Sequence, residues 1–343
     1  VLLVELKPAD GPRVWSECVA FERPNYSSET HDTAWIALRD YIAPRVLDVT
    51  LDGPGRVHGI LEKDFRGHRM AKAAVEMAVW TVAAERQGVS LARQLGGERD
   101  RIPVGISLGI QSSPAALVEK ASAAIAAGYR KIKIKIGPGE DIEYVAAVRA
   151  ALPQAPLMVD ANNAYTLDDA DHLARLDAFD LIMIEQPLEH EDLVRHAALQ
   201  RKLRTPVCLD ESITSVNRAE DMIELGSGRI VNIKPGRVGG FSSSLAIHDL
   251  CVQHAIPVWC GGMLESGIGR AYNVALATLP GFTIAGDLSP SARYWERDIV
   301  TPEWTLDADG MMRVPVDRPG IGVTVAEDRI EDMTVRRETI DAR

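Results

Sequence analysis

Lys133-Ile134-Lys135 is the first of five short apolar runs in this chain that each end in an ionisable residue. The other four are Leu157-Met158-Val159-Asp160, Ile182-Met183-Ile184-Glu185, Val207-Cys208-Leu209-Asp210 and Val231-Asn232-Ile233-Lys234. Their last residues are separated by 25, 25, 25 and 24 positions. This interval is typical of one strand plus one helix, repeated. In a (β/α)₈ barrel the carboxyl ends of the parallel strands surround one pocket, so we expect three carboxylates and two lysines to meet there.

The overall composition indicates an enzyme-sized globular protein. The 343 residues carry 38 basic and 49 acidic side chains, a net charge of −11, and 46% of them are hydrophobic. This is sufficient for one barrel and a small additional domain. The acidic balance argues against nucleic acid or an anionic membrane as a partner, because both need a basic surface, and it favours a small-molecule substrate. No run approaches the roughly 20 apolar residues of a membrane helix, and no signal peptide is apparent.

The four cysteines and the first residue give further expectations. Cys18, Cys208, Cys251 and Cys260 show no paired metal-ligand spacing, which favours reduced, buried thiols in a cytoplasmic protein. We also expect a homo-oligomer. The chain begins with Val1 rather than Met, so the natural N-terminus is expected to lie upstream.

Residues 1–97 do not follow the 25-residue interval and predict an α+β cap. Residues 1–6 and 14–19 read as a strand hairpin, and residues 30–46 and 69–87 as helices. Met70, Ala74, Met77 and Ala78 would form one buried stripe on the second helix. The predicted domains are therefore residues 1–97 as the N-terminal part of the capping domain, residues 98–294 as a (β/α)₈-type, TIM-like barrel, and residues 295–343 as strands that return to the cap.

The barrel begins with a predicted strand at residues 103–108, and residues 256–261 and 282–287 predict strands seven and eight. Ser113 followed by Pro114 is typical of a helix start, and Gly128 of its end. Thr166 with Asp169 resembles a capping box for a later helix.

The three acidic strand ends predict a magnesium site. Asp160, Glu185 and Asp210 would bring hard oxygen ligands from three neighbouring strands, which suits Mg²⁺. Zn²⁺ is disfavoured, because no His or Cys shares this periodic position. An acidic residue after a strand can simply cap the next helix, but three in step, between lysines in step, favour a site.

The lysines predict a base on each side of a metal-bound carboxylate. Lys133 and Lys135 point the same way from one strand, and we expect a lysine beside another cation in a dry pocket to lose its proton more easily. Lys234 would face them from the opposite side of the ring. A base beside the α-carbon of a carboxylate held by a divalent ion can produce an enediolate. Lys131 is expected at the outer end of the strand, facing solvent.

These residues, in this order, resemble the enolase superfamily and its muconate-lactonising subgroup, over nearly the whole chain. More closely, six strings resemble the o-succinylbenzoate synthase and N-succinylamino acid racemase family. They are residues 133–139 (KIKIGPG), 160–165 (DANNAY), 185–188 (EQPL), 209–212 (LDES), 232–240 (NIKPGRVGG) and 259–265 (WCGGMLE).

The resemblance implies a role for each matching residue. Asp160, Glu185 and Asp210 would bind Mg²⁺, with Mn²⁺ as a possible substitute. Lys135 would be the base, helped by Lys133, and Lys234 would face it. The implied reaction is the dehydration that forms o-succinylbenzoate in menaquinone biosynthesis, with racemisation of N-succinylamino acids as a second activity. A strand and a mobile loop over the pocket would precede Val1.

Five further residues are candidates for substrate binding or for support of the site. Arg237 would lower the pKa of Lys234, unless it forms a surface ion pair. Glu211 would pair with a lysine or support a ligand, and Asn162 would bind the substrate carboxylate or a metal-bound water, unless it only forms a turn. Gly262 and Met263 would let the backbone approach the succinyl group of the substrate.

Several other activities remain open from the sequence. Within the resemblance they are a dedicated N-acylamino acid racemase, a dipeptide epimerase and a muconate cycloisomerase. The epimerase is disfavoured because strand eight ends Gly286-Asp287-Leu288 without a second aspartate. Outside it, a lysine lyase that forms a Schiff base and a non-catalytic binding protein are the alternatives, although the first would not need three acids in step.

Overall fold

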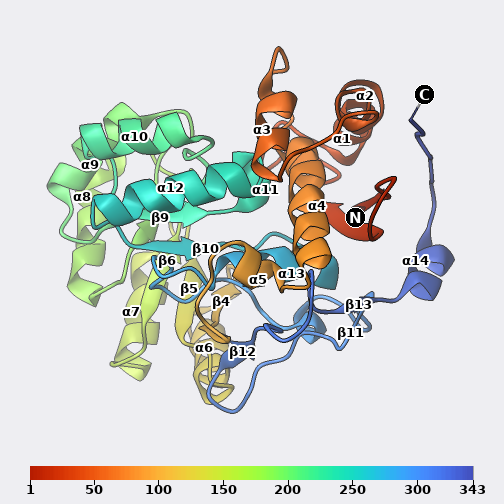
Figure 1. Ribbon diagram of the computed structural model, residues 1–343. Helices are drawn as coiled ribbons and strands as arrows, with labels where there is room; N and C mark the ends of the chain where they lie inside the picture. Colours follow the sequence, from red (N-terminus) through yellow and green to blue (C-terminus); the bar gives the residue numbers. More distant parts are fainter. Residues whose placement is uncertain (343) are drawn as a thin grey trace.

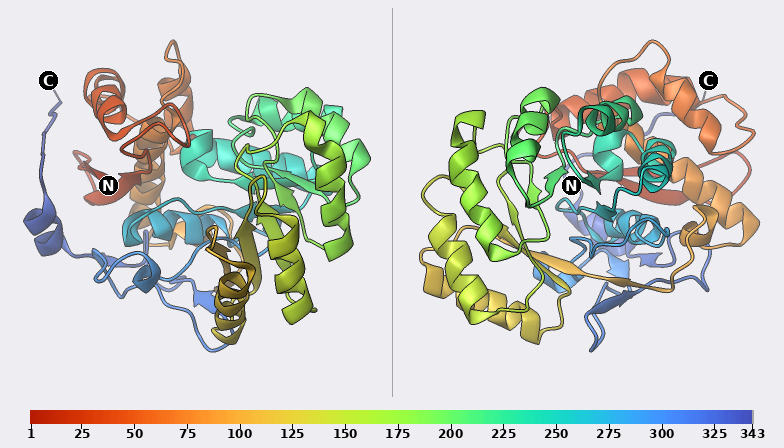
Figure 2. Two further views of the ribbon diagram at one scale, coloured as in Figure 1. Left: turned by 180° about the vertical axis from the view of Figure 1, so that it is seen from behind. Right: turned by 90° about the vertical axis from the view of Figure 1, so that its left-hand side faces the viewer.

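The computed structural model describes residues 1–342, and its centre is a parallel sheet of seven strands (Figure 1). The strands are β4 (Gly105–Leu108), β5 (Lys131–Lys135), β6 (Leu157–Asp160), β7 (Ile184–Glu185), β8 (Val207–Leu209), β9 (Ile230–Ile233) and β10 (Val258–Cys260). They lie side by side in chain order, each parallel to the next. This is the predicted barrel, and the right-hand view of Figure 2 shows its helices arranged around the strands.

The eighth position of the barrel is filled by a bridging segment rather than by a regular strand. Phe282 forms a parallel bridge with Val258 of β10, and Gly286 forms one with Val104, next to β4. The Gly105 amide donates to the Gly286 carbonyl at 2.7 Å, which closes the ring. The predicted strand at residues 282–287 is therefore correctly placed, but it is too sparsely paired to be a strand.

The predicted first strand is also shorter than expected. β4 begins at Gly105, whereas residues 101–103 form a separate strand, β3 (Arg101–Pro103). β3 pairs antiparallel with β12 (Met311–Arg313) of the C-terminal segment. The prediction failed because strand propensity continues through this region, while the hydrogen-bonding partner changes between Pro103 and Gly105.

Helices cover the outside of the barrel, and their ends agree with the signals in the sequence. Ser113 caps α6, its hydroxyl accepting from the Ala116 amide at 3.2 Å, and Gly128 follows the helix with a φ of +91°. Thr166 and Asp169 do form a capping box, although it opens a 3₁₀ turn, η2 (Leu167–Asp169). The outer elements are α6 (Pro114–Ala126), α7 (Ile142–Ala151), α8 (Ala170–Leu173), η3 (Ala174–Phe179), α9 (Leu193–Lys202), α10 (Val216–Leu225), α11 (Pro235–Val238), α12 (Phe241–Gln253) and α13 (Gly267–Leu276).

Inside the barrel, side chains two residues apart on a strand point the same way. Met158, Met183 and Cys208 each precede one of the acidic strand ends by two positions, and all three are fully buried. They form one cluster with Ile230 and Trp259. Uncharged side chains from β6 to β10 therefore fill part of the barrel interior beneath the acids.

The N-terminal part forms a cap with its own core. β1 (Leu2–Leu6) and β2 (Val14–Cys18) pair as the predicted antiparallel hairpin. A helical segment follows the Thr30 cap, and α4 (Arg69–Gln87) has the predicted bounds. The predicted stripe on α4 is buried, with exposures of 0–3%. The other cap helices are α1 (His31–Ile36), η1 (Ala37–Ile42), α2 (Ala43–Val46), α3 (Gly55–Glu62) and α5 (Leu91–Gln94).

Two buried glutamates of the cap bind the N-termini of barrel helices. Glu17 of β2 accepts from the Ser266 amide at 3.1 Å and from the Gly269 amide at 3.0 Å, at the start of α13. Glu76 of α4 accepts from the Phe241 amide at 2.7 Å, at the start of α12. The carboxyl oxygens accept from amides of the first helical turn that have no partner within the helix, so these contacts fix the cap against the barrel.

Stability should depend on pH through Glu17. Burial, partly offset by the contact with Ser266, raises the pKa of Glu17 from 4.5 to about 7. A raised pKa means that the folded protein holds this proton where the unfolded chain has lost it, so the contribution is complete below pH 4.5 and is lost as the pH rises to about 7. We expect the free energy of unfolding to fall by roughly 3 kcal/mol relative to Glu17→Gln over this range. Urea titrations of both proteins would measure it.

The exposed Glu220→Gln variant is the control for this measurement. It should follow the pH dependence of the unchanged protein. If the difference between the Glu17→Gln variant and the unchanged protein were constant with pH, Glu17 would be ionised throughout the range.

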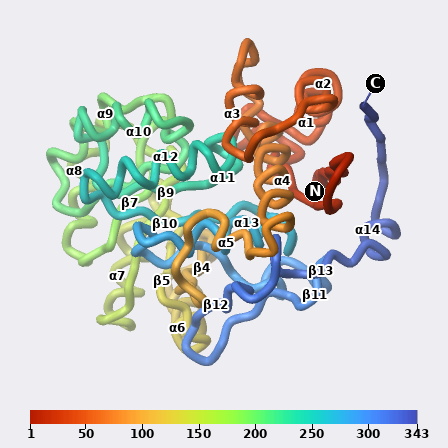
Figure 3. Tube along the Cα trace, viewed as in Figure 1, coloured from red at the N-terminus to blue at the C-terminus, as the bar shows by residue number. Residues whose placement is uncertain are grey.

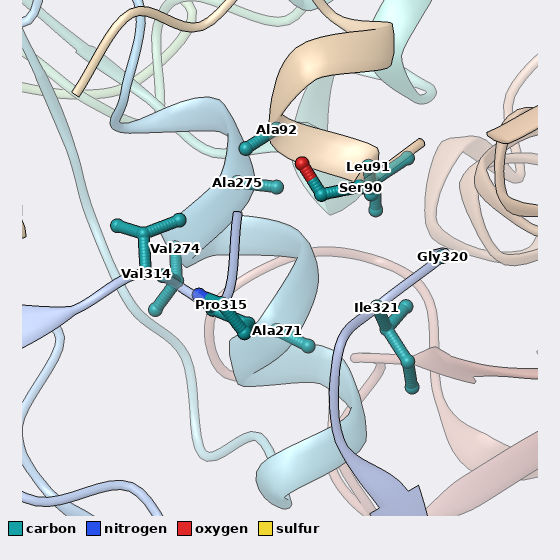
Figure 4. A pocket seen from close by; sticks show the side chains of 10 residues that line it. All are labelled: Ser90, Leu91, Ala92, Ala271, Val274, Ala275, Val314, Pro315, Gly320 and Ile321. Carbon is teal, nitrogen blue, oxygen red and sulfur yellow. The ribbon is translucent and has the colours of Figure 1, made fainter. Parts of the chain in front are cut away.

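The C-terminal segment, predicted as strands that return to the cap, forms only short strands and pairs outside the cap hairpin. β11 (Val300–Thr301) pairs with β13 (Thr324–Val325), β12 pairs with β3, and the segment ends in an unpredicted helix, α14 (Glu327–Met333). The tube in Figure 3 shows this segment on the side that carries the N-terminus. Ile321 and Val314 lie by Leu91 of α5 and Ala275 of α13, around a small gap (Figure 4). Backbone hydrogen bonds add to this packing, since the Leu91 amide donates to the Gly320 carbonyl at 2.7 Å.

The cysteines agree with the prediction: all four are buried, free thiols. Burial raises the pKa of Cys251 to about 12, which leaves it a poor nucleophile. Among the helices of residues 1–342, none has the length and apolar character that a membrane span requires.

Candidate active site

The three acidic strand ends lie at the carboxyl edge of adjacent strands. Asp160 and Glu185 are directly opposite each other in the register of β6 and β7, and Asp210 follows β8. All three are at most 1% exposed. β6, β7 and β8 lie between β5, which carries Lys133 and Lys135, and β9, which precedes Lys234. The structure therefore brings together the five residues of the periodic pattern, with Lys133 beside them.

Lys133 and Lys135 both point into the barrel, but carboxylates separate their charges. The Lys133 Nζ lies 3.2 Å from both Asp160 and Glu185, and 2.6 Å from Asp287. The Lys135 Nζ donates to Asp160 at 2.6 Å and also to Asn162. Burial lowers the pKa of Lys133, but the three carboxylates more than offset this and hold the pKa well above its usual range. The expected mutual lowering of pKa is thus absent at Lys133, which is held as a cation.

Lys135 differs from the other two lysines in its access to solvent. Its side chain is 30% exposed, against 7% for Lys133 and 8% for Lys234. Only Lys135 among the three therefore has its amine open to the mouth of the barrel.

On the opposite side, Asp210 joins Lys234, Arg237 and Tyr26. The Lys234 Nζ donates to Asp210 at 2.8 Å, and the Arg237 guanidinium donates to the other oxygen of Asp210. The Tyr26 hydroxyl also donates to Asp210, at 3.0 Å, and its ring lies 4.4 Å from the Lys234 Nζ. Burial lowers the pKa of Lys234, but Asp210 and Tyr26 raise it by a larger amount, so the net shift is upward.

Arg237 is 4% exposed, so the alternative that it forms a surface ion pair is wrong. It also donates from Nε to the Ile213 carbonyl at 2.7 Å. Arg237 shares Asp210 with Lys234, and it therefore opposes the pairing that raises the pKa of Lys234.

The acid cluster has the composition of a divalent-cation site. Within residues 1–342, no three His, Cys, Asp or Glu side chains are arranged to hold a metal ion directly; Glu185 pairs with Lys133, and Asp210 pairs with Lys234. Burial, and then the charge of Asp160, raise the pKa of Glu185 to about 8. A cation bound beside Glu185 would therefore favour its ionised form. The oxygen-only donors of the cluster fit Mg²⁺.

Asn162 and Glu211 form a chain that ends on Lys135. Asn162 has a φ of +41°, and its side-chain oxygen accepts from Lys135 while its nitrogen donates to Glu211 at 3.1 Å. Burial, and then Asp210, raise the pKa of Glu211 to about 7. Both residues therefore orient a lysine, in addition to the turn that Asn162 makes.

Gly261, Gly262 and Met263 lie against other parts of the protein. A side chain at Gly261 would meet Asn232 and, at 2.6 Å, the Lys234 side chain, and one at Gly262 would meet the Asp287 carbonyl. Met263 is 8% exposed and packs with the cap core. The glycines therefore leave room for Lys234 and for the bridging segment.

Comparison with known families agrees with this geometry. Residues 1–96 match the mandelate racemase/muconate lactonizing enzyme N-terminal domain, and residues 116–329 match the enolase C-terminal domain-like family. The chain belongs to the mandelate racemase/muconate lactonizing enzyme family. This confirms the resemblance and the barrel with a capping domain.

Individual relatives in this family are similar over nearly their whole length. An o-succinylbenzoate synthase of Geobacillus stearothermophilus is 50% identical over 97% of this chain and 88% of its own. An N-succinylamino acid racemase of Amycolatopsis is 48% identical over 94% of this chain and 87% of its own. A solved structure of an enolase superfamily member from Listeria innocua superposes with a TM-score of 0.93, at 41% identity, and covers 96% of this chain and 88% of its own.

In this member of the mandelate racemase/muconate lactonizing enzyme family, the prediction for Lys131 is wrong. Lys131 was expected to face solvent, but it is fully buried, 3.1 Å from Asp287 and 3.5 Å from the centre of the Trp259 ring. The alternation that turns Lys133 and Lys135 inward also turns Lys131 inward. The sequence pattern therefore itself indicates an inward-facing Lys131.

Three other residues of the site were missed. Asn232 donates to Glu185 at 2.8 Å, and its position two before Lys234 on one strand could have revealed it. Gln186 accepts from the Asp210 amide at 3.0 Å and so positions that acid. Tyr26 comes from the cap loop, and nothing in its local sequence indicates that it reaches the barrel.

Proposed function

We propose that the protein is a Mg²⁺-dependent o-succinylbenzoate synthase that also racemises N-succinylamino acids. The observation that carries the proposal is the placement of Lys135 and Lys234 on strands either side of three buried acids. Four relatives with 44–50% identity are named o-succinylbenzoate synthase, and two with 48% and 46% identity are named N-succinylamino acid racemase. Both names describe reactions that begin at a carbon next to a carboxylate.

Asp160, Glu185 and Asp210 are the residues that would hold Mg²⁺, or Mn²⁺ in its place. When bound, the ion would supply positive charge to the substrate carboxylate as the α-carbon loses its proton. The chain's own cations would reinforce this, since Lys133 is held charged by its carboxylate partners.

In the dehydration, Lys135 is the base. Its neutral amine takes the α-proton of the cyclohexadiene carboxylate, and the electron pair of the broken C–H bond forms an enediolate. The C–O bond to the hydroxyl then breaks as the ring double bond forms, and the Lys135 ammonium returns its proton to the leaving hydroxide, giving water. Lys234 stays protonated throughout, which its raised pKa favours.

In the racemisation, each lysine serves one face of the α-carbon. Lys135 removes the proton from one enantiomer and Lys234 delivers a proton to the opposite face, and the reverse reaction exchanges these roles. Lys234 must then pass through its neutral form, which the pairing with Asp210 opposes and the competition from Arg237 favours. The net upward shift in the pKa of Lys234 therefore favours dehydration as the main activity.

The remaining alternatives have weaker support. A dedicated N-acylamino acid racemase uses the same residues, whereas a dipeptide epimerase or a muconate cycloisomerase would need the pocket to accept another substrate. A Schiff-base lyase or a non-catalytic protein would leave three buried acids without a role. We further propose a cytoplasmic homo-oligomer, with residues 1–97 and 295–343 forming the cap and residues 98–294 the barrel.

A direct assay tests the proposal. The purified protein with Mg²⁺ should convert the cyclohexadiene carboxylate to o-succinylbenzoate, followed by absorbance, and should exchange the α-hydrogen of N-succinylamino acids in deuterated water, followed by NMR. A protein that forms a borohydride-trapped adduct with substrate, without metal dependence, would instead be a Schiff-base enzyme.

Lys234→Ala separates the two lysines in the exchange assay. We expect racemisation to fall by about 100-fold or more, because one face of the α-carbon loses its base. One enantiomer should still exchange its α-hydrogen through Lys135, without inversion. Lys135→Ala is the matched variant, and it should leave exchange of the other enantiomer only. Equal loss of exchange for both enantiomers in Lys234→Ala would mean that Lys234 is needed for binding or for charge stabilisation.

A further inference from the structure

A buried charge cluster lies beneath the acids, and the proposed mechanism does not use it. It consists of Lys131 on β5, Asp287 on the bridging segment and the ring of Trp259 on β10. Asp287 is 8% exposed, and its amide donates to the Cys260 carbonyl at 3.1 Å, so β10 holds its backbone. The eighth segment of the barrel therefore carries a fixed carboxylate into the interior.

The two oxygens of Asp287 face two different lysines. Oδ1 lies 3.1 Å from the Lys131 Nζ, and Oδ2 lies 2.6 Å from the Lys133 Nζ. The second of these is the shortest ion pair that Lys133 makes, since Asp160 and Glu185 each lie at 3.2 Å. The ammonium of Lys133 is thus drawn toward Asp287 from below and toward the two acids from above.

We propose that Asp287 is a positioning residue, which anchors the Lys133 ammonium beneath Asp160 and Glu185 while Lys131 balances the charge of Asp287. This inference rests on the proposed function. Without Asp287, Lys133 could follow the acids upward, into the space where their oxygens would hold a cation. With Asp287, the ammonium stays below that space and beside Lys135.

Lys131 has a supporting part in this arrangement. Its Nζ lies over the Trp259 ring, a favourable position for a cation with few other partners. Burial lowers the pKa of Lys131, and the two lysines hold the pKa of Asp287 at about 2 against the effect of its burial. An aspartate with only one of these lysines would still have a partner, whereas two lysines without the aspartate would repel each other in a dry interior.

This asymmetry gives a test with three variants: Asp287→Asn, Lys131→Met and the double variant. Asp287→Asn should lower kcat for dehydration by about 100-fold, with KM changed less than about threefold, and should lower the midpoint of urea unfolding. Lys131→Met should keep kcat within about tenfold, because Asp287 still holds Lys133. The double variant should regain the unfolding midpoint of Lys131→Met, because Lys131 is no longer present to repel Lys133. Its kcat should stay as low as that of Asp287→Asn.

Two outcomes would overturn the proposal. If the double variant regained kcat together with stability, Asp287 would serve only to neutralise Lys131. If Asp287→Asn kept full kcat, Asp287 would not be needed to position the Lys133 ammonium. The unfolding measurements are made on the metal-free protein and do not depend on the activity, and an unchanged protein without synthase activity would refute the proposed function instead.

Discussion

Replacing Lys135 with alanine is expected to lower kcat/KM for dehydration by about 1,000-fold or more. Lys135 is the most exposed of the three lysines at the mouth, and it contacts Asp160 and Asn162. A positioned general base contributes about 100- to 10,000-fold, and no other amine is open on that face to replace it. Steady-state kinetics with both the dehydration substrate and an N-succinylamino acid would measure the effect, and racemisation should be lost in parallel.

Two further variants distinguish a general base at position 135 from a positive charge there. Lys135→Arg keeps a cation beside Asp160 but cannot release its proton near neutral pH, so it should be as inactive as the alanine variant. Lys120→Ala, on an exposed turn of α6, should keep full activity. Substantial activity in Lys135→Arg would show that the position needs only positive charge, and the base would have to be sought elsewhere.

Removal of the divalent cation is expected to abolish turnover, and Asp210→Asn should have the same effect. Asp210 is 1% exposed and joins Lys234, Arg237 and Tyr26, so its replacement disturbs both the proposed ligand set and the opposite lysine. We expect activity to fall by about 1,000-fold or more in each case. Chelation followed by addition of Mg²⁺ should restore the unchanged protein but not the variant.

The metal should also be visible without an activity assay. Because the pKa of Glu185 is raised to about 8, binding must displace its proton, and Mg²⁺ affinity should rise by up to tenfold per pH unit until about pH 8. Calorimetric titration between pH 6 and 8 would measure this, with the exposed Asp221→Asn as control. Full activity in a chelated, metal-free preparation would contradict the enediolate mechanism.

The sequence alone was sufficient for the barrel and for the placement of five central residues. Strand-length runs at intervals of 25, 25, 25 and 24 residues place Lys135, Asp160, Glu185, Asp210 and Lys234 at the carboxyl ends of parallel strands. These placements depend only on the local periodicity and on the rule that the carboxyl ends of parallel barrel strands surround one pocket. Helix starts at Ser113 and Thr166 were predictable for the same reason, because a cap involves residues only three positions apart.

The partners of these residues were decided only by the tertiary structure. Tyr26 and Asp210 are 184 positions apart, and Lys133 and Asp287 are joined only because the ring closes between β10 and β4. The alternation on β5 turns Lys131 inward, but only the closed ring brings it against Trp259. The sequence determined which side chains reach the mouth of the barrel. Their charge states depend on burial and on carboxylates from distant strands, which exist as neighbours only after the chain has folded.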